Sequence, residues 1–120
     1  MNIVPKHIEV KNSPGKGLGV FATKDFNKGE LIERCYLISM DYTPKTKDYC
    51  FDYPLETRER YVLALGYGSI YNHNDDNNAK WKENIKGFFD FVAVKDIKKG
   101  DEICVNYGTV YWERQTKNKL

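Results

Sequence analysis

Apolar and polar residues alternate over short stretches of this chain, which is the pattern of half-buried β-strands. Residues 61–65 and 88–94 are strongly apolar, and residues 31–38 are rich in β-forming side chains. The predicted strands are residues 8–10, 20–22, 31–38, 61–65, 88–94 and 103–107. Helical periodicity is weak, and we predict only two short helices, at residues 56–63 and in the tail after Tyr111.

Turn-forming residues lie between the predicted strands. Pro, Gly, Asn, Asp and Lys gather at residues 13–15, 27–29, 75–78, 86–87 and 99–100. Many short strands joined by close turns favour a mostly-β domain built from small sheets.

Two segments of the chain resemble one another. Residues 25–32 read Asp-Phe-Asn-Lys-Gly-Glu-Leu-Ile, and residues 96–103 read Asp-Ile-Lys-Lys-Gly-Asp-Glu-Ile. Each is typical of a tight turn that leads into a strand, and Gly29 and Gly100 can adopt the positive φ that such turns need. We interpret the similarity as one structural device used twice, with no chemistry of its own.

Length and composition indicate one soluble domain. The chain has 120 residues, of which 41% are hydrophobic and 30% charged, and a domain of that size can bury a single core. The net charge of +2 is too small to indicate nucleic-acid binding. No stretch approaches the ~20 apolar residues of a membrane span, and the N-terminus lacks the apolar region of a signal peptide. We therefore expect an intracellular protein with no membrane partner.

Cysteine and aromatic residues narrow the choice of chemistry. Cys35, Cys50 and Cys104 are odd in number and widely spaced, so neither a disulfide framework nor a Cys-x-x-Cys zinc site is expected. We expect three reduced thiols and no bound metal. Nine Tyr, six Phe and two Trp make up 14% of the chain. Because tyrosine carries a polar hydroxyl on an apolar ring, this content favours a site lined by aromatic side chains.

Two short motifs are candidates for ligand binding. The glycines of Gly17-Leu18-Gly19 allow a backbone to approach a ligand closely. A dinucleotide fingerprint would need a third glycine and a helix after it, whereas a strand follows here. Asn72-His73 is the second motif. Taken alone, the first also fits an ordinary hairpin turn, and His73 also fits a hydrogen-bonded, half-buried histidine.

Tyr107 is the candidate for the chemistry itself. It follows an alternating strand and precedes Gly108, so a turn of the chain can present its hydroxyl to a pocket. The same position also fits a strand-end tyrosine that packs on the core.

Four segments, in this order and at these separations, resemble a SET domain: residues 15–22, 66–79, 99–103 and 106–112. The resemblance covers about residues 7–112 and extends to the compact stand-alone SET methyltransferases of large algal viruses and some bacteria. It implies a single SET domain over residues 1–120, with a tail at 113–120. The implied fold is mostly β, with several small curved sheets, short helices and a knot-like C-terminal arrangement.

The resemblance implies a protein-lysine N-methyltransferase that uses S-adenosylmethionine, releases S-adenosylhomocysteine and acts on a histone tail. It implies that Asn72 hydrogen-bonds the methionyl part of the cofactor, that His73 holds the adenine edge mainly through its backbone, and that Tyr107 is catalytic. The other implied cofactor-binding residues are Lys16, Gly17, Leu18, Gly19 and Trp112, and the implied walls of the substrate-lysine channel are Tyr49, Tyr107 and Tyr111.

The sequence departs from the family's usual pattern at three positions. Leu18 stands where an aromatic residue is frequent, so the cofactor pocket has one ring fewer. Asn74 stands where Ser is common, and Asn77 where Pro is common. Trp112, implied to stack on adenine, also fits a plug of the core near the C-terminus.

Methyl transfer to lysine requires a neutral amine as the nucleophile. With a reference pKa near 10.4, only about one lysine in a thousand is neutral at pH 7. A narrow aromatic channel lowers that pKa because it desolvates the ammonium group. Aligning the amine with the methyl group and the sulfur supplies several kcal/mol. No dedicated general base is needed if water takes the proton before transfer.

Two other functions fit parts of the sequence. A non-catalytic SET-like module would hold a peptide against aromatic rings, as methyl-lysine cages do, and binding of S-adenosylmethionine with methyl transfer distinguishes the enzyme from it. A nucleic-acid-binding β domain would use the aromatic residues for stacking, and the near-neutral charge argues against it.

The resemblance also implies a partner and a location. The zinc-bearing cysteine clusters that flank many eukaryotic SET domains are not in this sequence, so the C-terminal wall of the lysine channel must come from the tail or from a second subunit. We expect a homodimer that acts on a protein substrate and does not contact nucleic acid directly. A viral or eukaryotic source implies the host nucleus, and any other source implies the cytoplasm or a secreted effector.

Overall fold

The computed structural model describes residues 5–46, 49–54, 57–84 and 86–108, and these residues form nine strands and almost no helix. The mostly-β class predicted from the alternation is confirmed, and the six predicted strands correspond to β1, β2, β3, β5, β8 and β9. The strands are β1 (Ile8–Ser13), β2 (Gly17–Ala22), β3 (Leu31–Ser39), β4 (Cys50–Tyr53), β5 (Arg60–Ala64), β6 (Asn72–His73), β7 (Ala79–Asn84), β8 (Phe88–Ala93) and β9 (Glu102–Val105).

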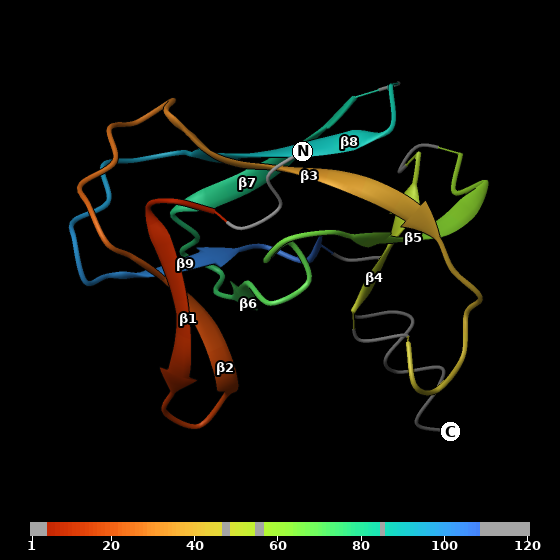
Figure 1. Cartoon of the computed structure of the whole chain (residues 1–120), viewed down its shortest axis with the longest axis horizontal. Helices are drawn as coiled ribbons and strands as arrows, with labels where there is room; N and C mark the ends of the chain where they lie inside the picture. Colours follow the sequence, from red (N-terminus) through yellow and green to blue (C-terminus); the bar gives the residue numbers. More distant parts are fainter. Residues whose placement is uncertain (1–4, 47–48, 55–56, 85, 109–120) are drawn as a thin grey trace.

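The strands form two curved sheets (Figure 1). The five-stranded sheet has the order β4-β5-β3-β8-β7 and is antiparallel throughout. The four-stranded sheet has the order β1-β2-β9-β6, and its β6–β9 pair is parallel. This arrangement places β6, a strand of two residues, beside β9, the last strand among the described residues.

The short helix predicted over residues 56–63 is wrong within the part of the segment that the structure describes. Residues 60–64 form β5, which pairs with β4 on one side and with β3 on the other. Val62 and Ala64 face the core and are 2% and 3% exposed. Hydrogen bonding to two neighbouring strands outweighs a weak local helical preference. The helix predicted after Tyr111 lies outside the described residues, as does the chain after Gly108 on which the knot-like arrangement depends.

Aromatic side chains fill the core. Phe89 and Phe91 of β8 are 0% exposed, and Tyr71 stacks on Phe91 with ring centroids 4.5 Å apart. Trp81 of the unpredicted strand β7 lies against Phe51, with ring centroids 5.0 Å apart. Ala79 is the only buried residue of β7, and Lys80, Lys82 and Glu83 are exposed, which is why its sequence carries a weak strand signal.

The two similar segments bind each other. Phe26 and Ile97 exchange two backbone hydrogen bonds, of 2.8 and 2.9 Å. The carboxylate of Asp96 accepts a hydrogen bond from the backbone N–H of Lys28, and that of Asp25 accepts one from Lys99, each at 2.8 Å. The predicted positive φ angles are confirmed in both turns, at 89° for Gly29 and 95° for Gly100. The repeated device is therefore a reciprocal clasp that ties β2 and β3 to β8 and β9.

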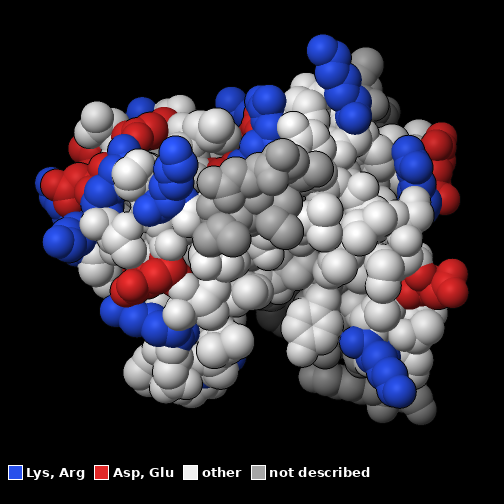
Figure 2. All heavy atoms as spheres, viewed as in Figure 1, with Lys and Arg blue, Asp and Glu red and all other residues white. Residues whose placement is uncertain are grey.

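The surface is mixed in charge and hollowed on one side. Lysine, arginine and acidic side chains intermingle on the face in Figure 2, which also shows a notch between the β1–β2 hairpin and the segment that leads into β4. None of the described helices is long and apolar enough to cross a membrane. Cys35, Cys50 and Cys104 are free and buried. The described residues contain no group of three or more metal-ligating side chains that could hold an ion.

Candidate active site

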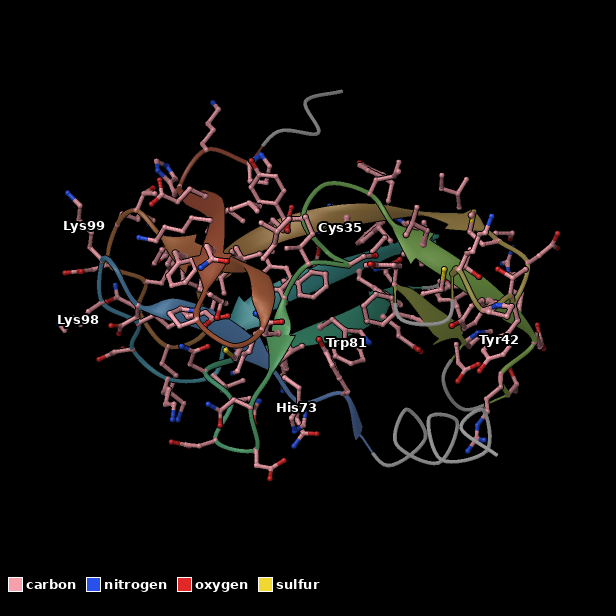
Figure 3. All side chains as sticks on the ribbon, turned by 90° about the horizontal axis from the view of Figure 1, so that it is seen from below. Cys35, Tyr42, His73, Trp81, Lys98 and Lys99 are labelled. Atoms are coloured by element: carbon pink, nitrogen blue, oxygen red, sulfur yellow. The ribbon has the colours of Figure 1, made fainter. Side chains whose placement is uncertain are left out.

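Sheet pairing brings three distant parts of the sequence together. In the β6–β9 pair, Asn72 lies opposite Cys104 and His73 opposite Val105. On its other side, β9 pairs with β2, where Phe21 lies opposite Glu102. The β1–β2 turn, β6 and the end of β9 therefore meet in one region. Figure 3 shows His73 at the end of β6, away from Tyr42 and from the Lys98–Lys99 turn.

Asn72 joins the start of β2 to β9. Its side-chain Nδ2 donates to the backbone oxygen of Leu18 at 3.0 Å and to the carboxylate of Glu102 at 2.8 Å. Lys16 lies on the same side, with its Nζ 3.5 Å from the backbone oxygen of His73. The start of β2, Gly17-Leu18-Gly19, is thus fixed directly against the Asn72-His73 pair.

Gly17 and Gly19, at the start of β2, serve different purposes. Gly17 has a φ of 81°, a conformation that L side chains rarely adopt. Gly19 gives room instead, because a Cβ at this position would lie 2.5 Å from Glu102 Oε2 and 3.0 Å from Asn72 Nδ2. The motif therefore sets both the bend of the hairpin and its close approach to β6.

Both ring nitrogens of His73 are engaged. The backbone N–H of Tyr107 donates to His73 Nδ1 at 2.9 Å, and Nε2 lies 2.6 Å from the carboxylate of Asp75. Since Nδ1 accepts, the proton is on Nε2, which donates to Asp75. His73 thus holds the chain at Tyr107 and is not free to act as a general base.

The hydroxyl of Tyr107 is held by a chain of contacts that reaches the core. It donates to the backbone oxygen of Tyr71 at 2.7 Å, and the hydroxyl of Tyr71 donates to Glu33 at 2.8 Å. Burial raises the pKa of the Glu33 carboxyl, although its hydrogen bonds to Tyr71 and Tyr67 oppose that change. Burial, with Glu33 beside it, also raises the pKa of Tyr71 well above the ordinary value. With its proton committed to Tyr71, the Tyr107 oxygen can accept a hydrogen bond from an amine.

The other predicted site residues stand apart from these contacts. Tyr49 lies just before β4, is 56% exposed, and takes no part in the contacts that join residues 16–19, 72, 73 and 107. The side chain of Leu18 is 58% exposed, so only its backbone meets Asn72. Tyr111 and Trp112 lie outside the described residues.

Sequence reasoning missed two carboxylates of the site. Glu102 accepts a hydrogen bond from the side chain of Asn72, and nothing in the sequence distinguishes it from the surface acids around it. The sequence could have identified Glu33, because it shares a strand face with Cys35 and Leu37 in an alternating stretch. In the structure it is 8% exposed. An acid on the apolar face of a predicted strand is uncommon and needs a partner.

Asn78 lies in one of the four segments that resemble a SET domain, and its side chain makes two hydrogen bonds to the backbone of β9. Its Nδ2 donates to the backbone oxygen of Glu102 at 2.9 Å, and its Oδ1 accepts from the backbone N–H of Cys104 at 2.8 Å. These bonds tie the residue before β7 to β9, next to the position where Cys104 pairs with Asn72 of β6.

The SET-domain family profile matches residues 17–108, which contain every described residue of this site except Lys16. The chain belongs to the SET-domain family. The family expected from the four segments is thereby confirmed, and the two curled sheets are those of a SET fold.

Similar proteins of known activity include lysine methyltransferases. This SET domain is 26% identical over 118 residues to a histone-lysine N-methyltransferase of Schizosaccharomyces pombe, specific for H3 lysine-37, and the match spans 92% of this chain and 79% of the yeast protein. It is 31% identical over 122 residues to an N-lysine methyltransferase of Xenopus tropicalis, covering 78% of this chain but only 34% of the frog protein.

Solved structures support the same assignment. A proposed histone methyltransferase of Plasmodium falciparum superimposes with a TM-score of 0.77 and 32% identity, over 91% of this SET domain and 99% of that chain. A ctPRC2 complex with H3K27me3 and H3K27M gives a TM-score of 0.69 and 25% identity, over 88% of this chain and 15% of that one. The chain thus shares its fold and family with enzymes that methylate lysine.

Proposed function

We propose that this SET domain transfers a methyl group from S-adenosylmethionine to a lysine of a histone tail. The observation that carries the proposal is the convergence of Gly17–Gly19 at the start of β2, Asn72 and the Tyr107 hydroxyl in one region. These places are 35 or more residues apart in sequence, and Tyr107 and Asn72 are fixed there by hydrogen bonds to the backbone.

The residues present fit S-adenosylmethionine. The cofactor supplies a methyl group on a positively charged sulfur, together with an ammonium group and a carboxylate. The glycines at the start of β2 let the backbone approach a ligand closely. Lys16 offers a cation for the carboxylate of the cofactor, and Asn72 offers an amide oxygen for its ammonium group. Gly17, Leu18, Gly19 and the backbone of His73 form the remaining described part of this proposed site.

Tyr107 is the proposed catalytic residue. Its hydroxyl donates to Tyr71 and can accept a hydrogen bond from the substrate amine, which orients the amine's lone pair. No described residue of the site is an available base, since His73 is engaged at both nitrogens. The substrate ammonium is therefore proposed to lose its proton to water as it is desolvated by aromatic walls. We propose Tyr49 and Tyr111 for those walls, beside Tyr107.

A histone substrate is supported by what similar proteins act on. The yeast relative is specific for lysine-37 of histone H3, and the ctPRC2 structure contains the modified and substituted histone peptides H3K27me3 and H3K27M. A histone substrate would place the protein with chromatin, in the nucleus of a host or of its own cell.

The test is transfer of labelled methyl from S-adenosylmethionine to a histone mixture, with the modified lysine located by mass spectrometry. Tyr107→Phe removes one hydroxyl, and we expect turnover to fall about 100-fold or more, because the amine loses its oriented contact, while cofactor affinity stays within about twofold. Unchanged turnover would show that Tyr107 is misassigned. Cofactor binding without transfer to any protein would instead favour the non-catalytic peptide-binding module.

A further inference from the structure

The carboxylate of Glu102 joins β1 to β6 beside the proposed cofactor site. Glu102 Oε1 accepts a hydrogen bond from the hydroxyl of Ser13 at 2.8 Å, and Oε2 accepts one from Asn72 Nδ2 at 2.8 Å. Ser13 ends β1 and is 2% exposed, Glu102 begins β9, and Asn72 begins β6. The Glu102 side chain therefore lies between the hairpin and the strand that carries Asn72.

This contact decides which way the Asn72 amide faces. Nδ2 has two hydrogens, and they are donated to two groups that can only accept, the Leu18 carbonyl and the Glu102 carboxylate. Turning the amide over would place its oxygen against both acceptors and leave two unfavourable contacts. Oδ1 must therefore point away from Glu102, where it can accept from a ligand.

The missing side chain of Gly19 makes this arrangement possible. A Cβ at this position would lie 2.5 Å from Glu102 Oε2, closer than real Cβ atoms approach, and 3.0 Å from Asn72 Nδ2. Gly19 does not have the positive φ of Gly17, so its requirement is space. The second glycine of the motif thus leaves room for the carboxylate.

We propose that Glu102 is the positioning residue that orients Asn72 so that its Oδ1 accepts a hydrogen bond from the ammonium group of the cofactor's methionyl part. The proposal rests on the proposed function. It adds a specificity: the Glu102–Asn72 pair selects ligands that carry this ammonium group and does not contribute to binding of the adenosine part.

Calorimetry with two ligands tests the proposal. S-adenosylmethionine carries the ammonium group, and 5′-methylthioadenosine keeps the adenosine and sulfur but lacks the amino-acid part. Glu102→Gln keeps the shape of the side chain but leaves only the Leu18 carbonyl to fix the direction of the Asn72 amide. We expect it to weaken S-adenosylmethionine binding about tenfold, and to leave 5′-methylthioadenosine within about twofold.

Two further variants exclude a purely structural effect. In the Asn72→Ala background, Glu102→Gln should cause no additional loss of S-adenosylmethionine affinity, because the group through which it acts is gone. Glu30→Gln makes the same chemical change at a carboxylate that accepts from Lys24 and from the backbone of Asn27, and it should leave the ratio of the two affinities unchanged.

The outcomes separate this proposal from the proposed function. An equal loss for both ligands in Glu102→Gln, or additive losses in the double variant, would overturn the positioning role. Failure of the wild-type protein to bind S-adenosylmethionine at all would overturn the proposed function instead. Thermal melting of each variant confirms that the protein measured is folded.

Discussion

At the scale of single residues, the site depends on backbone groups held by side chains. Asn72 binds the carbonyl of Leu18, His73 binds the N–H of Tyr107, and Tyr107 binds the carbonyl of Tyr71. Each motif residue is therefore fixed by an element distant from it in the sequence. Small changes in one contact are expected to appear as changes in turnover or affinity.

Tyr71→Phe tests the chain of contacts from Glu33 to Tyr107. The substitution keeps the ring that stacks on Phe91 but leaves the buried Glu33 without its hydroxyl donor, at a cost of about 1–3 kcal/mol of stability. Because the Tyr71 carbonyl holds Tyr107, we expect kcat to fall about three- to tenfold with little change in KM for the cofactor. In a Tyr107→Phe background the same change should not lower kcat further, and an additional loss there would refute the link.

Glu33→Gln tests the pH dependence of stability. Burial raises the pKa of Glu33 above its ordinary value of 4.5, so the folded protein holds this proton more tightly than the unfolded chain. The resulting stability is complete below the unfolded pKa and is lost as pH rises through the folded pKa. We therefore expect Glu33→Gln to gain stability relative to wild type as pH is raised from about 4 to about 8, as measured by urea unfolding.

Glu30→Gln is the matched control for that measurement. The hydrogen bond from Lys24 lowers the pKa of Glu30, which is half-buried, so the sign is reversed. Its stabilising effect is present above the unfolded pKa and is lost as pH falls through the folded pKa. The Gln variant should therefore lose stability relative to wild type over the same range, and only slightly. If both variants gained stability relative to wild type as pH rises, the Glu33 effect would not come from burial.

At the scale of elements, the reciprocal clasp between residues 25–32 and 96–103 positions β9 for the site. Gly29 donates its backbone N–H to Ala93 at the end of β8, and Gly100 donates its own to Ala22 at the end of β2, each at 2.8 Å. Two copies of one turn thus hold β3 against β8 and β9 against β2. Their similarity in sequence reflects similar surroundings in the structure.

Asp25→Ala and Asp96→Ala test the symmetry of the clasp. Each removes one carboxylate that accepts a backbone N–H from the opposite turn, at the same distance of 2.8 Å. We expect each to lower the free energy of unfolding by a similar amount, about 0.5–1.5 kcal/mol, measured by urea unfolding. Asp41→Ala, at another exposed acid, is the control. A large effect for one aspartate and none for the other would show that the two halves are not equivalent.

At the scale of the whole molecule, the proposed site extends past the described residues. Tyr49 and Tyr107 of the proposed channel are described, whereas Tyr111 of the channel and Trp112 of the cofactor site belong to the chain after Gly108. The expected homodimer would supply a wall from a second subunit. We predict that light scattering at micromolar concentration gives twice the chain mass of 14.0 kDa, with methyl transfer in the same fractions. A fully active species of single-chain mass would contradict the dimer.

The sequence by itself determined six of the nine described strands, the turns and the family. Short alternating or continuously apolar stretches mark β1, β2, β3, β5, β8 and β9, because the side chains that face the core must be apolar. Gly29 and Gly100 marked their turns because other residues rarely adopt positive φ. The resemblance of four ordered segments to a SET domain indicated the family without any coordinates.

Only the tertiary structure decided the pairing and the roles of buried acids. The sequence predicts residues 61–63 both as part of a strand and as part of a helix, and pairing with β3 and β4 on either side decides for the strand β5. β6 is two residues long and exists only beside β9. Glu102 and Glu33 became part of the site because hydrogen-bond donors from other elements meet them there. Such contacts depend on positions in space, and a linear sequence gives the donors and acceptors without saying which of them meet.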